Sequence, residues 1–544
     1  MRKNVKKQLA LRVLSTAALM AMVSSIATAA FADTYDLNKG SVDILAEGGE
    51  QRITQWEDKD NNLCVKDGEG KEIRNRLDDD ITLTTKDETT GETKTTSNTV
   101  TIDAKDGNTA NVTLENVHIE VDTTDAKSGA IEIKGDGDTN LELNGNNTVQ
   151  VKNNWSEEHA AIEKADKYGT GTLTIKDDVN DNGTAKTGTD EDTTGKLLAG
   201  GYHNSAAIGG GSDSYNREYS LADTSNITIT GGKITAIAGN DGAAAIGGGY
   251  DGTGKNIRIK GNADVTAVSA DGAAIGGGIG SGNSVTITDD AVVDARSAFA
   301  AAIGNGDQVG RPNDPTTITI SGNATVHAET SQSGCAIGTG RDGSRSDLTI
   351  NIEKNANVTA IASHDTPAIG NAGCHGDTTT TINITGGTVN AINSFGTDYP
   401  EYSSRYDGTG DTSPAIGGMI HSWDVYGDHT ATCNVNINSS TGKGSGTAIG
   451  SSYKGQNVPA DSVSYKADGS SHFGERNSAI VNCYNNGIVN NGIVADENKK
   501  LDLPSTKDDF ALNNVSSYRH EITGGTLTKV VHNRKYMDEN PKID

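Results

Sequence analysis

The chain has 544 residues, with 46 Lys and Arg against 73 Asp and Glu, which gives a formal net charge of −27 at pH 7. This charge argues against nucleic acid and anionic membranes as partners, because both are polyanions that would repel the chain. It leaves neutral glycans and divalent cations as possible ligands. The five cysteines are too few and too scattered for a disulfide framework in a chain of this length.

Residues 1–32 have the features of a secretory signal peptide. Five basic residues precede an apolar run from Val13 to about Ala27, and the A-x-A sequence at residues 30–32 is typical of a cleavage site. The apolar run is shorter than the roughly 20 residues that a membrane-spanning helix needs. We therefore expect a secreted protein, which could also be associated with the cell surface, whose mature chain has no membrane span.

Residues 33–97 show only a faint repeat, although residues 41–45 and 81–84 alternate between apolar and polar side chains as strands do. A stack of repeats needs a terminal unit that covers its last apolar layer. We expect this region to be an N-terminal cap.

The N-terminal region also contains an incomplete calcium-loop pattern. Asp58, Asp60, Asn62 and Glu69 occupy positions one, three, five and twelve of such a loop, but Leu63 replaces the glycine that the sharp turn requires. No complete motif supports calcium, and we assign neither a cofactor nor a metal ligand.

Residues 98–455 repeat a unit that ends in Ala-Ile-Gly. Each clear unit has a first strand of alternating Ile and Thr, a turn with Gly or Asn, a second strand with a Val/Ile-x-Ala core, and a third strand with the Ala-Ile-Gly motif. Such units predict an all-β, right-handed parallel β-helix with about three short strands per coil. The isoleucines of the motif, spaced 28 to 47 residues apart, are Ile208, Ile246, Ile275, Ile303, Ile337, Ile369, Ile416 and Ile449.

Outward positions of these strands should align in columns along the helix. Two interpretations stay open for them: an ordinary solvated polar surface, or a hydroxyl and amide surface that matches a sugar chain. The predicted first-strand column is Thr228, Arg258, Thr286, Thr319, Thr349 and Asn383, and the second-strand column is Thr235, Thr266, Asp294, His327, Thr359 and Asn390.

Residues 456–544 lose the repeat, which returns once as Glu521–Leu527. We expect this region to be a C-terminal cap that contains one remnant coil.

Aromatic residues collect in the loops that follow the Ala-Ile-Gly motif. Flat rings with a polar tip suit the faces of sugars, but they also suit packing of each loop onto the helix. Both interpretations stay open. The candidate ligand-binding residues are Tyr215, Tyr219, Tyr250, Trp423, Tyr426 and Tyr453.

No residues are assigned a catalytic role. His203, His327, His364 and His375 are separated by whole coils or lie in loops, and no nucleophile motif is present. A β-helix lyase would need a basic residue beside acidic ones. The candidates near clear coils, none of which has an evident acidic cluster in the sequence, are Arg258, Arg296 and Arg311.

The repeats from about residue 98 to residue 453, such as residues 227–232 and the early coil at 111–117, resemble those of secreted bacterial β-helix proteins. These belong to the pectate-lyase-like superfamily, which includes non-catalytic, carbohydrate-binding members. The resemblance implies the fold, an exported location and a polysaccharide or host-glycan partner, with other surface proteins as further candidates. It carries no active-site residues, because the lyase motifs have no match.

Three functions follow as hypotheses. The first is a non-enzymatic protein that binds glycans or mediates adhesion. The second is a degenerate polysaccharide lyase or hydrolase, and the third is a purely structural component of the cell surface. Converging basic and acidic residues in a groove would favour the second, and smooth outer faces would favour the third.

Overall fold

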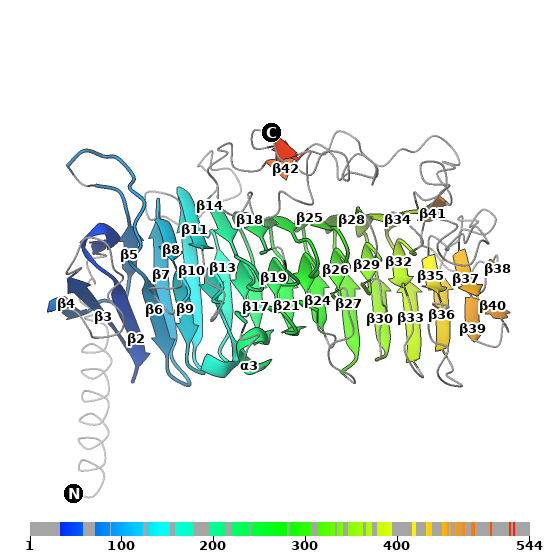
Figure 1. Ribbon diagram of the computed structural model, residues 1–544, viewed down its shortest axis with the longest axis horizontal. Coiled ribbons are helices and arrows are strands. Elements are labelled where there is room, and N and C mark those ends of the chain that lie inside the picture. Colours follow the sequence, from blue (N-terminus) through cyan, green and yellow to red (C-terminus); the bar gives the residue numbers. More distant parts are fainter. Residues whose placement is uncertain are drawn as a thin grey trace, which may run out of the picture.

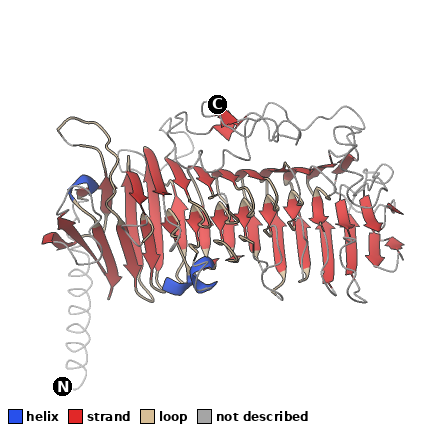
Figure 2. Ribbon diagram, in the orientation of Figure 1, coloured by secondary structure: helices blue, strands red, loops and turns tan. Residues whose placement is uncertain are grey.

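The computed structural model describes residues 33–57, 71–87, 89–122, 128–152, 158–178, 195–212, 219–239, 241–279, 283–306, 314–331, 334–340, 346–362, 366–372 and 378–393, together with ten short strands beyond residue 393. These residues form a rod in which three long sheets run side by side along the axis (Figure 1). Strands make up most of the described structure, and helices are few and short (Figure 2).

Sheet 1 collects the first strand of each repeat. Its strands stack in parallel along the rod, except for two antiparallel strands at the C-terminal end. In the part of the chain that the structure describes, its 14 strands are, in order, β1 (Thr34–Asp36), β5 (Ile81–Thr84), β7 (Thr109–Glu115), β10 (Asp138–Asn144), β13 (Leu173–Lys176), β17 (Ile227–Ile229), β21 (Ile257–Ile259), β24 (Ser284–Ile287), β27 (Thr316–Ile320), β30 (Leu348–Ile352), β33 (Thr378–Ile384), β36 (Ala431–Ile437), β39 (Val463–Lys466) and β40 (Ser471–Phe473).

Sheet 2 collects the second strands, and all its neighbouring strands are parallel. Counted over the described residues, its ten strands are β41 (Ile480–Tyr484), β34 (Thr388–Asn393), β31 (Asn357–Ala362), β28 (Thr325–Thr330), β25 (Val292–Ser297), β22 (Asp264–Val268), β18 (Lys233–Ile237), β14 (Lys196–Gly200), β11 (Asn146–Lys152) and β8 (His118–Asp122).

Sheet 3 collects the third strands, which carry the Ala-Ile-Gly motif. Among the residues placed by the structure, its 15 strands are β38 (Gln456–Asn457), β37 (Ile449–Tyr453), β35 (Ile416–Met419), β32 (Ile369–Asn371), β29 (Ile337–Gly338), β26 (Ile303–Gly304), β23 (Ile275–Gly276), β19 (Ile246–Gly247), β15 (Ile208–Gly209), β12 (Ile162–Glu163), β9 (Ile131–Lys134), β6 (Val100–Ala104), β2 (Val42–Glu47), β3 (Glu50–Glu57) and β4 (Lys71–Leu77). The chain passes from sheet 1 to sheet 2 to sheet 3 and back, so the predicted parallel β-helix with three strands per coil is confirmed.

The core lies between the three sheets and follows the predicted alternation. In the coil made by β21, β22 and β23, the inward residues Ile257, Ile259, Val265, Ala267 and Ile275 are all 0% exposed. Burial of a large aliphatic side chain stabilises the fold by about 1.5–3 kcal/mol. Because each inward residue stacks on its counterpart in the neighbouring coils, every coil depends on the next one for its apolar contacts.

The Ala-Ile-Gly motif requires glycine at its last position for a steric reason. Its φ lies between 135° and 148° in seven successive coils, a conformation that side chains rarely adopt. A Cβ on Gly276 would lie 2.1 Å from the carbonyl oxygen of Gly304 in the next coil. Only glycine permits this approach. We call these residues the glycine column, and they are Gly209, Gly247, Gly276, Gly304, Gly338, Gly370 and Gly417.

At the N-terminal end, parallel stacking begins upstream of residue 98, because β1 pairs with β5 and β2 pairs with β6. The antiparallel strands β3 and β4 then extend sheet 3 beyond β2. A short 3-10 helix, η1 (Leu37–Lys39), contributes the fully buried Leu37 to this end of the core. The division into cap and repeat regions stays a prediction.

At the C-terminal end, β41 pairs in parallel with β34 and so extends sheet 2. The remaining described strands, β42 (Leu501–Asp502), β43 (Ile522–Thr523) and β44 (Thr526–Leu527), form a separate antiparallel sheet that contains part of the predicted remnant coil.

The short elements lie at the edge of the coils. They are the 3-10 helix η2 (Asp166–Tyr168), the helix α3 (Tyr219–Ala222) and the paired strands β16 (Thr224–Ser225) and β20 (Gly254–Lys255). No helix in the described ranges is long and apolar enough to cross a membrane. The predicted signal peptide and the calcium-loop residues lie outside the described residues.

Candidate functional site

Tyr250 is the one aromatic candidate whose side chain the structure describes. It is half-buried, its backbone N–H donates to the carbonyl of Asn204 at 2.8 Å, and its ring lies 3.0 Å from the position that a Cβ on Gly242 would take. The ring therefore packs on a neighbouring loop. Tyr219 starts α3 and Tyr453 ends β37, while Tyr215, Trp423 and Tyr426 lie outside the described residues, so the predicted aromatic edge remains a prediction.

The outer face of sheet 1 carries the predicted polar column with one correction. The strand registers align Thr319 with Asn351 and place Thr349 beside Thr317, in the neighbouring column. The prediction for Thr349 was wrong because β27 and β30 are longer than the Ile-Thr-Ile core used to align them. The sheet 1 column is Thr228, Arg258, Thr286, Thr319, Asn351 and Asn383.

The side chains of the sheet 1 column are half-buried, except Arg258, which is exposed. Several are joined along the rod, since the side-chain amide of Asn383 donates to Asn351 Oδ1 at 2.9 Å. The neighbouring column continues this pattern where Asn256 donates to Asn226 at 2.5 Å. Such links hold hydroxyl and amide groups in a fixed row with a spacing of about 4.8 Å.

The outer face of sheet 2 differs from that of sheet 1. Its predicted column is confirmed by the strand registers. Of the two interpretations left open for this column, an ordinary solvated surface does not hold for Thr235, Thr266, Asp294 and His327, which are 3–7% exposed.

Arg296 on this face sits in an acidic cluster, contrary to the sequence-based expectation. Its Nε donates to Asp294 Oδ1 at 3.0 Å, and its Nη1 donates to Glu329 Oε2 at 2.9 Å. Arg296 itself is 2% exposed. Asp294 precedes Arg296 by two residues on the same face of β25, and the register places Glu329 opposite Arg296 on β28. The sequence contained this signal, but finding it required the alignment of neighbouring coils.

A second polar group lies upstream of the glycine column on sheet 3. Strand pairing aligns Glu132 with Glu163 and Glu163 with Gly209, so the two glutamates occupy the position that glycine takes later. Glu158 and His159 lie between the two strands in sequence, in the loop before β12, which carries Glu163. We call Glu132, Glu158, His159 and Glu163 the buried carboxylate cluster, because each is at most 5% exposed.

Contacts hold this cluster together across coils. His159 Nδ1 lies 2.7 Å from Glu163 Oε2, and Lys134 Nζ lies 2.8 Å from Glu132 Oε2. The Asn204 amide donates to Glu158 Oε1 at 3.1 Å. Among the described residues, Glu163 Oε1 has no hydrogen-bond partner, and it faces Gly211.

Burial changes the acidity of two members of the cluster. It raises the pKa of Glu158 to about 7, so this carboxyl group is partly protonated near neutral pH. Burial also raises the pKa of Glu132, and the negative charge of Glu163 adds to that effect. A carboxyl group with such a pKa can donate a proton to a leaving group.

The cluster was missed in the sequence, although a signal existed. Residues 129–132 and 160–163 repeat the end of the coil, but with Glu where the later coils have Gly. An interruption by a charged residue at an otherwise fixed glycine position indicates a local function or a polar contact.

Metal binding and cysteine chemistry receive no support from the described residues. No group of three or more His, Cys, Asp and Glu side chains in these ranges is placed to hold a metal ion. Cys335 is fully buried in the coil, and the other cysteines have no described side chain. Comparisons of the chain with protein-family models, with curated proteins and with solved structures find no match.

Proposed function

We propose that this chain is an exported, non-enzymatic protein that binds polysaccharide or a host glycan through the outer face of sheet 1. The observation that supports this proposal is the sheet 1 column, which aligns Thr and Asn side chains over successive coils with Arg258 as the one charged member. Adhesion to a glycan-bearing surface is the role that follows. Export rests on the signal-peptide pattern of residues 1–32.

The physical argument starts from the row of polar groups. Hydroxyl and amide side chains both donate and accept hydrogen bonds, as sugar hydroxyls do. Links such as that from Asn383 to Asn351 reduce the freedom of these side chains before a ligand binds, which lowers the entropic cost of binding. A linear glycan laid along the rod would meet one such group per coil.

Co-sedimentation of the full chain with insoluble plant and host polysaccharides, with and without calcium, tests the proposal. The double variant Thr319→Val and Asn351→Leu keeps the side-chain shape but removes two sets of hydrogen bonds. At about 0.5–1.5 kcal/mol for each lost bond, affinity should fall about tenfold. Thr95→Val, an exposed threonine outside the sheets, is the matched control and should bind normally.

Binding that is equal in the double variant and in the control would contradict the proposed face. Binding to none of the polysaccharides would contradict the proposal and favour a structural role. Either result can be separated from misfolding by circular dichroism, because loss of the β-helix would change the spectrum of the variant alone.

The buried carboxylate cluster favours a second candidate function, glycoside hydrolysis. Glu158 would serve as the general acid, since burial brings its pKa close to neutral pH. The same co-sedimentation experiment tests this candidate when the supernatant is assayed for released sugar. Release that is lost in Glu158→Gln would replace the non-enzymatic proposal, and absence of release would remove the second candidate.

A further inference from the structure

We propose that the corner between sheets 2 and 3 binds the protonated amino group of an amino sugar through Asp241 and Glu158. This inference rests on the proposed glycan binding and deepens it, because it names the class of sugar.

Three consecutive residues organise this corner. Tyr202, His203 and Asn204 follow β14, and they contact carboxylates from the coils on either side. His203 Nδ1 lies 2.8 Å from Asp241 Oδ2, and the side-chain amide of Asn204 donates to Glu158 Oε1 at 3.1 Å. The backbone N–H of Asp241 also donates to the His203 carbonyl at 3.3 Å. We call Glu158, Tyr202, His203, Asn204 and Asp241 the corner site.

The first argument is a buried oxygen atom without a donor. Glu158 is 5% exposed, and its backbone exchanges two hydrogen bonds with that of Ser212, at 3.1 and 2.6 Å. Among the described residues, Glu158 Oε2 nevertheless has no hydrogen-bond partner, and the same holds for Asn204 Oδ1. Buried polar atoms normally have a partner. Because both atoms are acceptors here, the partner that they lack is a donor.

The second argument is the negative charge that collects at the corner. Burial raises the pKa of Tyr202, and the charges of Asp241, Asp122 and Glu158 add to this effect, so all three carboxylates act on one hydroxyl group. Asp241 exposes 47% of its side chain, so a ligand that arrives from solution meets it first. An acidic corner of this kind attracts cations.

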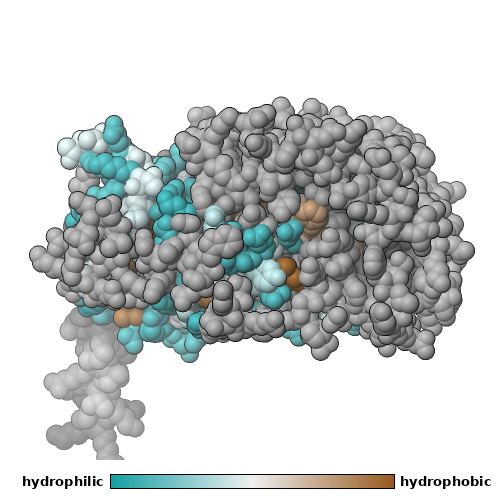
Figure 3. All heavy atoms as spheres, viewed as in Figure 1, coloured by the Kyte–Doolittle hydropathy of each residue, from teal (hydrophilic) through white to brown (hydrophobic). Residues whose placement is uncertain are grey.

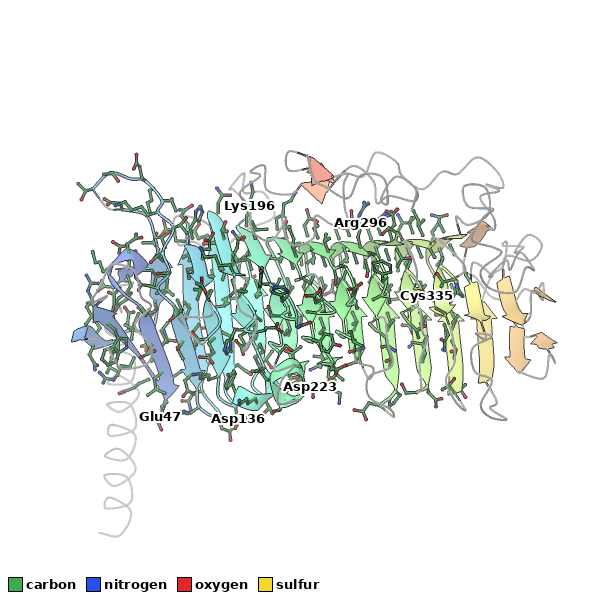
Figure 4. The ribbon with its side chains drawn as sticks, in the orientation of Figure 1. Glu47, Asp136, Lys196, Asp223, Arg296 and Cys335 are labelled. Atoms are coloured by element: carbon green, nitrogen blue, oxygen red, sulfur yellow. The ribbon has the colours of Figure 1, made fainter. Side chains whose placement is uncertain are left out.

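Nearby lysines do not compensate this charge. Lys196 and Lys233 are the first residues of β14 and β18, whereas the corner follows the last residues of these strands. Figure 4 shows Lys196 at the edge of the rod. At about 3.3 Å per residue, the length of a five-residue strand separates these lysines from the corner. Lys152, at the end of β11, pairs with Glu120.

The third argument concerns the kind of cation. In the ranges that the structure describes, no group of three or more His, Cys, Asp and Glu side chains is placed to hold a metal ion. A protonated amino group makes a different demand, because it carries separate N–H donors and needs no closed shell of ligands. Hydrogen bonds from such a charged donor to a carboxylate are stronger than those between neutral groups.

Aromatic rings beside the carboxylates favour a sugar as the carrier of the amino group. The Tyr202 ring centroid lies 4.1 Å from that of His203, and the Tyr250 ring lies beside Gly242, the residue after Asp241. Flat rings suit the faces of sugars, and they also attract cations. On the face of the molecule shown in Figure 3, the described residues are mostly hydrophilic and the hydrophobic areas are small. Such a surface suits a sugar better than an apolar partner.

The acidity of Glu158 supplies a second readout. Burial raises its pKa to about 7, so near neutral pH part of the population carries a proton. A bound cation favours the ionised carboxylate. Binding should therefore release a proton from Glu158.

Isothermal titration calorimetry of the full chain with an oligomer of glucosamine tests the inference. The corresponding oligomer of N-acetylglucosamine, which has no charge, should bind at least about tenfold more weakly. Asp241→Asn should reduce the affinity for the glucosamine oligomer about tenfold and leave that for the acetylated oligomer unchanged. Asp264→Asn is the matched control, because Asp264 exposes 49% of its side chain at the other end of the sheet 2 strands.

Glu158→Gln tests the buried part of the corner site. Titrations near neutral pH in buffers that differ in ionisation enthalpy count the protons released on binding. The unchanged protein should release more protons than Glu158→Gln, which should also bind the glucosamine oligomer more weakly. Circular dichroism verifies that the variants remain folded.

Four outcomes overturn the inference. They are equal affinity for the two oligomers, equal affinity of Asp241→Asn and Asp264→Asn for the glucosamine oligomer, and equal proton release by Glu158→Gln and the unchanged protein. The fourth is poly-lysine that binds as tightly as the glucosamine oligomer and loses affinity in Asp241→Asn, which would assign the corner to a basic protein.

The sheet 1 double variant separates this inference from the proposed function. If Thr319→Val with Asn351→Leu loses binding to neutral polysaccharides while Asp241→Asn changes nothing, the inference fails and the proposed function stands. If Asp241→Asn weakens binding of the glucosamine oligomer while the double variant binds every polysaccharide normally, the inference stands and the proposed face fails.

Discussion

Replacement of Glu158 by glutamine should make the protein more stable at alkaline pH and leave it nearly unchanged at acidic pH. Burial raises the pKa of Glu158 from its ordinary 4.5 to about 7 in the folded protein. At about 1.4 kcal/mol per pKa unit, this difference corresponds to roughly 3 kcal/mol. Because the pKa of Glu158 is raised in the folded state, the contribution of this group to the free energy of unfolding is fully present below pH 4.5. It is lost as the pH rises to about 7.

Glutamine resembles the protonated glutamate in shape and has no charge to bury. Glu158→Gln should therefore match the unchanged protein at pH 4.5 and exceed its free energy of unfolding by about 3 kcal/mol at pH 8. The prediction concerns the difference in free energy of unfolding between Glu158→Gln and the unchanged protein, because the raised pKa of Glu132 adds a pH dependence that both proteins share.

Guanidinium unfolding between pH 4.5 and pH 8.5 measures this difference. Hydrogen exchange in β12 and β15 localises it, because a rod of coils can open in parts. Glu50→Gln, at an exposed position on β3, is the control and should show no such trend. A stabilisation by Glu158→Gln that is equal at pH 4.5 and pH 8.5 would refute the reasoning.

Two further substitutions test the packing of the rod. Gly276→Ala should destabilise the fold by more than about 3 kcal/mol, because the new Cβ would lie 2.1 Å from the Gly304 carbonyl oxygen. Gly107→Ala, whose new Cβ would have no atom within 4 Å, should cost only about 1 kcal/mol, because of the backbone φ of 73° at that position. Similar losses of melting temperature for the two would contradict this. Arg296→Ala should cost about 3–5 kcal/mol by leaving buried acidic groups without their partner, and a cost no larger than that of Arg52→Ala, an exposed arginine on β3, would show that the buried pair contributes nothing.

The fold could be predicted from the sequence because each position of its repeat is restricted to residue types that have one structural role. The isoleucines of sheet 3, such as Ile246 and Ile275, pair directly in the structure, as their recurrence predicts. The glycine after each of them was predicted within the third strand and lies there, but the pattern alone gave no reason why it must be glycine. The closeness of neighbouring coils determines its identity, and that distance is a property of the stack and not of one repeat.

The candidate sites were harder to predict, because they depend on contacts between coils. The separation of 33 residues between Arg296 and Glu329 does not by itself predict a contact. The ion pair forms because the register of β25 and β28 places the two residues opposite each other. The same register moved Thr349 out of its predicted column by two positions.

The glycine column has a consequence for how the length of such a rod changes. Each glycine fits against the backbone of the next coil, so the pitch admits no intermediate values. A whole repeat can be gained or lost without disturbing its neighbours, and the segments between successive Ala-Ile-Gly motifs vary in length. The length of the rod therefore changes in steps of one coil, while the lengths of its loops change independently.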